Sequence, residues 1–409
     1  MCIRDSQWLV GVLSGFGLGP LVVDIIMSLL GSVIISTAML LLVVALIIIE
    51  RKIIGRFQSR FGPNRVGPYG LLQTIPDMIK IFTKEHITPE GADVIVYNLA
   101  PILVTCSVIL LWAVVPYSST VVGADLNVGV LYLIAVGALG TIAIFMAGWS
   151  SNNKYALIGA LRTAAQMISY EVPMVAVMLV PVMLTGSMGL NDIVKAQQVW
   201  YVVLSPLAAL LFFIAAQAEV GRAPFDLLEA ESEIIAGHHI EYSGLKFGFF
   251  FVAEFLHSFT MSALVAILFL GGWQGPWANT YPILGFFYFT IKAFFVYFVV
   301  LWVRASLPRV RIDQLMNFAW KLLVPLSFAL VIATALLEKL LALNGVIGVW
   351  RVASHLLLNA LIIWLTVLIL ISQEKRKPRQ IVVNSKRPVA MGSKQPITCL
   401  LYTSPSPRD

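Results

Sequence analysis

Long apolar segments recur along the whole 409-residue chain and constrain its fold more than any other feature. A transmembrane α-helix needs about 20 consecutive apolar residues to cross the hydrocarbon of a bilayer. With 59% hydrophobic and 12% charged residues, the composition excludes an ordinary soluble domain. We therefore predict an all-α polytopic membrane protein with about nine transmembrane helices. The predicted spans are approximately 27–49, 98–116, 128–149, 157–184, 200–219, 247–270, 282–303, 321–341 and 355–372.

The distribution of lysine and arginine predicts how these helices are oriented, because cytoplasmic loops retain positive charge. Alternate loops are rich in basic residues, and so is the C-terminal tail, whereas the intervening loops hold few. This alternation predicts an N terminus outside and a C terminus in the cytoplasm. The net charge of +7 follows from this topology and requires no nucleic-acid partner. The basic loops and tail include Arg51, Arg60, Lys154, Arg222, Arg304, Arg311 and Lys375, and the other side has chiefly Lys195, Lys339 and Arg351.

The segment from Glu219 to Tyr242 is the least expected part of so apolar a chain. Its sequence is EVGRAPFDLLEAESEIIAGHHIEY, and it lies beside two predicted spans. Carboxylates in such a position are costly unless they face water, protein or a charged pathway. We therefore look for function here. The segment has the single arginine Arg222 and six acids, namely Glu219, Asp226, Glu229, Glu231, Glu233 and Glu241.

Within this acidic segment the sequence predicts a short helix. Pro224 interrupts any helix that continues from the preceding span, and Asp226 stands three positions before Glu229, the spacing of a capping box. The new helix would begin at Leu227 and end near Gly237, so one interpretation of Asp226 is that it is a helix cap and nothing more. Glu229 would share a helix face with Glu233, four positions on. Exposure to water would make this pair harmless, and burial would let the two carboxyls share protons.

The loop after the first span is basic and rich in turn-forming residues. It begins ERKIIGRFQSRFGPNRVGPYG, in which the Gly-Pro pairs end any continuing helix. The following LLQTIPDMIKIFTKE has apolar residues at helical spacing but contains Asp77, Lys80, Lys84 and Glu85, so it is too polar to span. We expect a helix at the membrane surface or beneath a partner protein. The basic residues fit either contact with lipid headgroups or a functional contact.

Neither cysteines nor histidines predict a metal site. Cys2, Cys106 and Cys399 lack both a disulfide framework and metal-ligand spacing. His238 and His239 are adjacent rather than four positions apart, which favours an interfacial loop pair over a metal site. A glycine-rich nucleotide loop of the required spacing is also missing from the sequence. Any iron–sulfur chemistry is therefore expected on another chain.

Several long strings of the chain resemble one family. They are ERKIIGRFQSRFGPNRVGPYGLLQ, LIGALRTAAQMISYEVPM, EVGRAPFDLLEAESE, IEYSG and WVRASLPRVRIDQLM. In this order, over about residues 20–335, they resemble the H-subunit family of proton-pumping NADH-quinone oxidoreductase, respiratory complex I. The resemblance implies one component of a translocase enzyme, inactive alone, in the bacterial cytoplasmic membrane. It would form part of the quinone chamber and couple quinone reduction to proton translocation.

The resemblance also implies partners and cofactors. FMN and the iron–sulfur clusters would belong to partner subunits, and quinone would be the substrate. The partners would be the peripheral-arm subunits of the quinone site, small membrane-arm subunits and membrane lipid, with no nucleic acid.

Carried onto this sequence, the family's functional residues fall into two groups, and we assign no catalytic residue and no metal ligand. Glu171 and Glu254 lie in predicted spans without a basic neighbour in their own helix, so we expect either proton relay or a hydrogen bond between helices. The expected quinone-chamber residues are Arg51, Arg60, Asp77, Arg222, Asp226, Glu229, Glu231 and Glu233. The expected proton-pathway residues are Glu85, Glu171, Glu219, Glu241 and Glu254.

The resemblance divides the chain into regions. Residues 7–341 would form the quinone-chamber membrane domain with the family's eight-helix core, and 342–395 would add an extra transmembrane helix and a basic tail. The ends, 1–6 and 399–409, show no resemblance and are interpreted as non-native sequence of the kind that adapter read-through adds to metagenomic assemblies.

Two other functions stay open on the sequence. One is the equivalent membrane subunit of an energy-converting hydrogenase or ferredoxin-linked complex, although GPNRVGPYG and the full acidic segment favour the quinone enzyme. The other is a stand-alone cation transporter, with which Glu171, Glu254 and Lys292 within the spans are compatible. Against the transporter, the sequence shows no inverted repeat with paired broken helices.

Overall fold

A computed structural model describes residues 19–226, 235–345 and 348–376 of the chain. These residues are mostly α-helical, and among them only an isolated bridge between Pro116 and Val122 resembles strand pairing. The chain divides into two compact units, Met1–Thr366 and Val367–Asp409. The site lies in the first unit.

In the described part of the chain, eight helices are long and apolar enough to cross a membrane. The fifth predicted span, 200–219, is instead α8 (Tyr201–Leu204) followed by the 15-residue α9 (Pro206–Val220), an apolar helix shorter than the other eight. The eight long apolar helices confirm the predicted all-α polytopic fold. The eight are α2 (Pro20–Phe57), α4 (Val94–Leu111), α5 (Gly129–Ser150), α6 (Lys154–Thr185), α11 (Gly244–Phe269), α12 (Pro282–Ser306), the continuous segment Ile312–Leu343 that ends in α14 (Val324–Leu343), and α15 (Val349–Arg376).

Proline and glycine set many of the helix boundaries. Pro20, Pro206 and Pro282 stand at the first position of α2, α9 and α12, where the missing N–H has no helical partner to lose. α6 begins at Asn153, whose side chain accepts a hydrogen bond from Tyr155 N at 2.9 Å. α6 and α9 are both followed by a glycine in the left-handed conformation, which glycine adopts easily because it has no Cβ.

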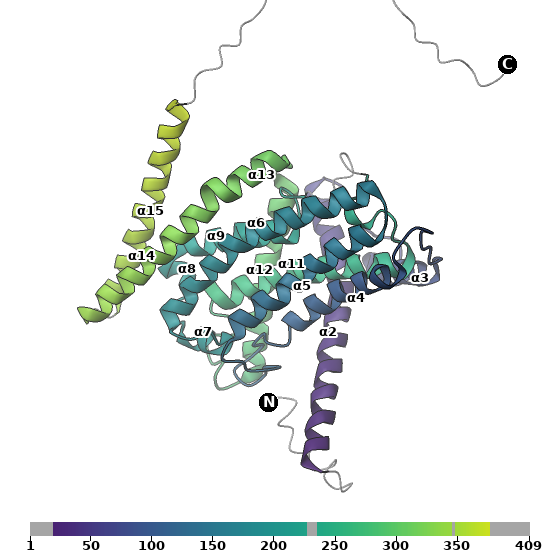
Figure 1. Cartoon of the computed structure of the whole chain (residues 1–409). Coiled ribbons are helices and arrows are strands. Elements are labelled where there is room, and N and C mark those ends of the chain that lie inside the picture. The colour runs from purple at the N-terminus through teal and green to yellow at the C-terminus, as the bar shows by residue number, and fades with distance from the viewer. Residues whose placement is uncertain (1–18, 227–234, 346–347, 377–409) are drawn as a thin grey trace, which may run out of the picture. The chain divides into compact units, whose positions relative to one another are not determined.

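Helix α11 is the centre of the bundle. Of its most apolar stretch, 78% of residues are buried, against 22% for α2 and 17% for α15. α4, α9 and α12 pack directly on α11, and α5 and α6 lie beyond, each packed on the other (Figure 1). Polar residues on α11 are therefore held within protein rather than facing lipid.

Loops that follow alternate spans meet at the same end of the bundle, as alternate crossing of a membrane requires. Asp93 N donates to Ser150 O at 3.1 Å, and Val310 N donates to Pro224 O at 3.0 Å. At the other end Val130 N donates to Met188 O at 3.0 Å. The basic loops thus gather at one end, and the assignment of that end to the cytoplasm stays a prediction.

The remaining helices are short. The helix predicted after the first span is confirmed as α3 (Thr74–Thr83), with exposed apolar side chains at Ile79 and Phe82, and its contact with the membrane surface or a partner protein stays a prediction. The predicted helix after Asp226 lies outside the described residues, which resume at Ile235. The others are η2 (Pro68–Gly70), α7 (Leu190–Ala196), η3 (Gly237–His239), α13 (Ile312–Phe318) and a π-helical turn (Ala319–Leu323) that leads into α14.

Candidate functional site

A cluster of four charged side chains lies near one end of the bundle, and the four come from three different helices and one loop. Glu50 is near the end of α2, Arg222 follows α9, Glu254 is on α11 and Arg304 is near the end of α12. Arg222 Nη1 donates to Glu50 Oε2 at 2.5 Å, and its Nε donates to Glu254 Oε1 at 3.2 Å. Arg304 pairs with the other oxygen of Glu50, and Tyr297 Oη donates to Glu50 Oε2 at 2.9 Å. We call Glu50, Arg222, Glu254 and Arg304 the charged cluster.

The charged cluster is electrically balanced, with two cations and two anions. The side chains of Arg222 and Glu50 are only 1% and 4% exposed, and the Arg222 guanidinium also lies over the Phe255 ring at 4.7 Å. Burial alone would lower the pKa of Arg222, but the carboxylates of Glu50 and Glu254 outweigh burial and raise it. Arg222 therefore stays charged, and charges this deeply buried are tolerated only because they are paired.

The loop that carries Arg222 is fixed by hydrogen bonds on both sides. Gln166 Nε2 on α6 donates to Ala218 O at 2.7 Å and to Phe225 O at 2.8 Å. Gln217 Nε2 donates to Ala223 O at 3.1 Å. These bonds and the Val310–Pro224 bond satisfy carbonyl groups of an irregular segment that is buried. They hold the Arg222 backbone at a defined place relative to α6 and α9.

The charged cluster borders two spaces. The inner cavity lies between α11 and the helices α4, α5 and α6, and the centre of a water molecule can occupy about 80 Å³ of it. Its polar lining comprises Ser107, Glu219, Arg222, Asp226, His238, His239, Glu254, His257 and Arg304. The outer pocket, about 650 Å³ by the same measure, is lined by the end of α2, the loop after it, α11 and α12, and includes Glu50, Arg51 and Arg60. Glu254 and Arg304 line both spaces, so these side chains stand in the wall that separates them.

An apolar groove of about 510 Å³ by the same measure runs between α2, α3 and α11. Ile47, Met78 and Val252 contribute one lining side chain from each helix. Arg51 lines both the groove and the outer pocket, and Phe251 lines the groove, the outer pocket and the inner cavity. The three spaces therefore adjoin at Phe251, and together they run from an apolar surface to the charged cluster.

The described quinone-chamber candidates are distributed around these spaces. Arg51 Nη1 pairs with Asp77 Oδ2 at 2.5 Å beside the groove. Arg60 is exposed at the outer pocket, where its Nε donates to Gln58 Oε1 at 2.7 Å. Arg222 and Asp226 line the inner cavity. Glu229, Glu231 and Glu233 lie outside the described residues.

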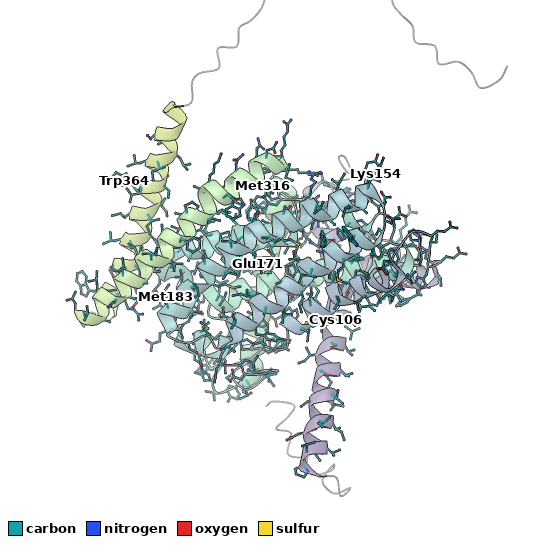
Figure 2. The ribbon with its side chains drawn as sticks, viewed as in Figure 1. Cys106, Lys154, Glu171, Met183, Met316 and Trp364 are labelled. Atoms are coloured by element: carbon teal, nitrogen blue, oxygen red, sulfur yellow. The ribbon has the colours of Figure 1, made fainter. Side chains whose placement is uncertain are left out.

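The proton-pathway candidates fall into three places. Glu219 is buried in the inner cavity and interacts electrostatically with Glu171 on α6, which Figure 2 labels. Glu254 lies in the wall of the same cavity, and its basic partner is Arg222 from another element, which helix spacing could not reveal. Glu241 lies apart, where Asn153 Nδ2 donates to its Oε1 at 2.6 Å. Glu85 is exposed on the loop after α3.

Sequence reasoning missed Glu50, Arg304, Tyr297 and His257. Glu50 and Arg304 stand inside two of the recognised strings, but Arg304 was attributed to topology and Glu50 was given no role. Tyr297 and His257 had no distinguishing signal, since a polar residue within an apolar helix acquires meaning only from its neighbours on other helices.

The two adjacent histidines lie in an aromatic environment. His238 packs edge-on against Phe250, with ring centroids 5.3 Å apart, and against His239 at 5.1 Å. Burial and the neighbouring His239 lower the pKa of His238 to about 3, and burial lowers that of His239 to about 4. Both are therefore neutral at pH 7. Across residues 19–226, 235–345 and 348–376, histidine, cysteine and carboxylate side chains nowhere converge in groups of three as a metal site would need.

Comparison with known proteins identifies the family. The NADH dehydrogenase family model matches residues 30–335. A protein of Dehalococcoides mccartyi (strain CBDB1), named as the H subunit of NADH-quinone oxidoreductase, is 54% identical over 287 residues, which cover 70% of this chain and 80% of the relative. Proteins of the same name from Carboxydothermus hydrogenoformans (47% identity over 77% of this chain and 90% of the relative) and Geobacillus thermodenitrificans (50% over 74% and 93%) are also similar. With these relatives and its eight apolar helices, the chain is a multi-pass protein of the bacterial inner membrane. It therefore belongs to the NADH dehydrogenase family, the family of the bacterial NADH-quinone oxidoreductase H subunits.

Proposed function

We propose that this chain is the membrane subunit of an NADH-quinone oxidoreductase that receives quinone and couples its reduction to proton translocation. The names of the relatives support the enzyme complex. The observation that carries the finer proposal is the adjacency of three spaces at Phe251, an apolar groove, a polar outer pocket and an inner cavity with buried carboxylates.

The groove and the outer pocket match the two halves of a quinone. An isoprenoid tail is apolar and fits between α2, α3 and α11, where Ile47, Met78 and Val252 form an apolar lining. The headgroup has two carbonyl oxygens, which accept hydrogen bonds, and the outer pocket offers the donors Arg60 and Arg304. Partner subunits of the peripheral arm would complete this pocket on the side that the present chain leaves open.

The charged cluster supplies the coupling. Reduction of a quinone to a quinol consumes two electrons and two protons, and the electrons would come from the iron–sulfur clusters of partner subunits, as would FMN chemistry. Negative charge that develops in the outer pocket acts on Arg304 and Glu254, which also face the inner cavity. Glu219 and Glu171 then continue the chain of carboxylates into the membrane.

The test separates quinone reduction from NADH oxidation in the assembled complex. Arg60→Ala removes an exposed donor of the outer pocket, so the fold should stand. Losing one hydrogen bond from a charged group weakens headgroup binding by about 1.5–3 kcal/mol, which corresponds to a KM for quinone roughly 10- to 150-fold higher. NADH oxidation by a hydrophilic artificial acceptor should be unchanged.

A matched control is Arg65→Ala, because Arg65 is an exposed arginine of the same loop that lines neither the groove nor the outer pocket. We expect wild-type quinone kinetics from it. Wild-type kinetics in Arg60→Ala as well, with a normally assembled complex, would contradict the proposed quinone pocket.

A further inference from the structure

His257 occupies a position in the inner cavity that neither the family resemblance nor the charged cluster explains. It follows Glu254 by three positions on α11, so the two side chains share a helix face. Both line the inner cavity. The Nδ1 and Nε2 atoms of His257 are buried, and neither has a hydrogen-bond partner among the described residues.

Other buried polar atoms of the same cavity also lack a hydrogen-bond partner among the described residues. Glu219 Oε2, His238 Nδ1 and Arg222 Nη2 are also buried and unpaired in the described part of the chain. Buried polar atoms in proteins are almost always hydrogen-bonded, to protein or to water. The centre of a water molecule can occupy about 80 Å³ of this cavity, and one water needs about 10–15 Å³ by that measure, so the cavity has room for several. We infer that water molecules join these atoms to one another.

Carboxylates at two places along the cavity wall make His257 a bridging group. Glu254 and its partner Arg222 belong to the charged cluster, and Glu219 is the buried carboxylate that interacts with Glu171. A neutral imidazole has one N–H donor and one acceptor nitrogen, so the ring can accept a proton at one nitrogen and release one from the other. The other titratable groups that face the cavity are Asp226, His238, His239 and Arg304.

We propose that His257 is a proton-exchanging residue that connects the charged cluster with Glu219. A proton delivered through cavity water from the Glu254 side binds the free ring nitrogen and forms an imidazolium. The other nitrogen then releases its proton towards the carboxylate of Glu219. The neutral ring is left as the opposite tautomer, and exchange with cavity water restores the first one. Protons alone move in this step. The proposal rests on the proposed function, because the protons are those of quinone-coupled transport.

The experiment uses the complete complex in sealed vesicles. His257→Gln keeps hydrogen bonding but cannot titrate, and His257→Ala leaves space for added imidazole. We expect quinone-linked turnover and proton transport to fall at least about tenfold in both variants, in line with the contribution of a positioned proton-transfer group. The KM for quinone and NADH oxidation by a hydrophilic acceptor should not change. The matched control His86→Gln alters an exposed histidine outside the cavity and should behave as wild type.

Imidazole rescue distinguishes proton exchange from a structural role. Added imidazole should restore turnover of His257→Ala in proportion to its unprotonated fraction, and His257→Gln should lose the pH dependence that the wild type shows. Wild-type turnover and pH profile in His257→Gln would overturn the proposal, as would slow variants that imidazole does not rescue. Arg60→Ala in the same vesicles tests the proposed function separately. If Arg60→Ala raises the quinone KM while His257→Gln behaves as wild type, only the His257 proposal fails.

Discussion

Removal of Arg222 tests whether the charged cluster is held together by charge balance. Arg222→Gln leaves Glu50 with Arg304 and Tyr297 but deprives Glu254 of its cation, so two carboxylates face one arginine. Loss of one partner from a buried ion pair destabilises a protein by about 3–5 kcal/mol. Because Arg304 still pairs with Glu50, we expect the lower end of this range. About 3 kcal/mol is more than a hundredfold in an equilibrium constant.

The second substitution is chosen to restore the balance. Arg222→Gln with Glu254→Gln leaves the Glu50–Arg304 pair and no uncompensated charge. We expect this double variant to recover much of the lost stability, although not the activity. Arg51→Gln is the matched control, because it breaks an ion pair of the same 2.5 Å length in which Arg51 is 41% exposed. Exposed pairs contribute about 0–1 kcal/mol.

The assay is the fraction of chain that remains in the intact complex after heating of detergent-purified samples, read on native gels. Arg222→Gln should lose the complex at a clearly lower temperature than wild type, and Arg51→Gln close to the wild-type temperature. The reasoning is refuted if Arg222→Gln is as heat-stable as wild type. It is equally refuted if the double variant is less stable than Arg222→Gln alone, because charge imbalance would then not be the cause.

Two further predictions concern the inner cavity and the adjacent histidines. Gly137 on α5 lines the cavity, and a Cβ at this position meets no atom within 4 Å. Gly137→Leu should therefore fill the space and slow proton transport several-fold in vesicles, whereas Gly137→Ala should have almost no effect. Normal transport in the leucine variant would count against the cavity as a proton route. His238 and His239 have lowered pKa values in the folded state, so as pH falls below about 6.5 the unfolded chain takes up their protons first and heat stability falls, by at most about 1.4 kcal/mol per pH unit for each histidine. Their joint replacement by glutamine should flatten this dependence between pH 7 and 5, and an unchanged dependence would exclude them as its source.

The fold followed from sequence because apolar length is a local property. Segments of about 20 apolar residues predict helices wherever they occur, and the surface helix α3 was identified by its mixture of apolar and charged positions. The exception is α9, whose predicted span began at residue 200. Pro206 has no N–H for a continuing helix, and the backbone of Ser205 is non-helical, so α8 and α9 are separate.

The candidate site was only partly predictable, for a different reason. Arg222 was found because an arginine among acids is conspicuous within one segment. Its partner Glu50 stands 172 positions away, and Arg304 is 254 positions from Glu50. Such pairs are created by packing between helices, and no spacing rule along one helix reports them. For the same reason Glu254 seemed to lack a cation until the loop after α9 was placed beside α11.

The side chains of the charged cluster differ in exposure, so two of them can change rotamer more easily than the other two. Arg222 and Glu50 are sealed in protein, and the Arg222 backbone is fixed by Gln166, so neither can change partners without opening the bundle. Glu254 and Arg304 are 23% and 31% exposed and face both neighbouring spaces. A charge that enters the outer pocket can therefore pull on these two side chains while every helix stays in place. Under the proposed function, the inner cavity would experience that event as a change of electric field, and coupling across this wall would need only side-chain rotation, which is faster than movement of helices.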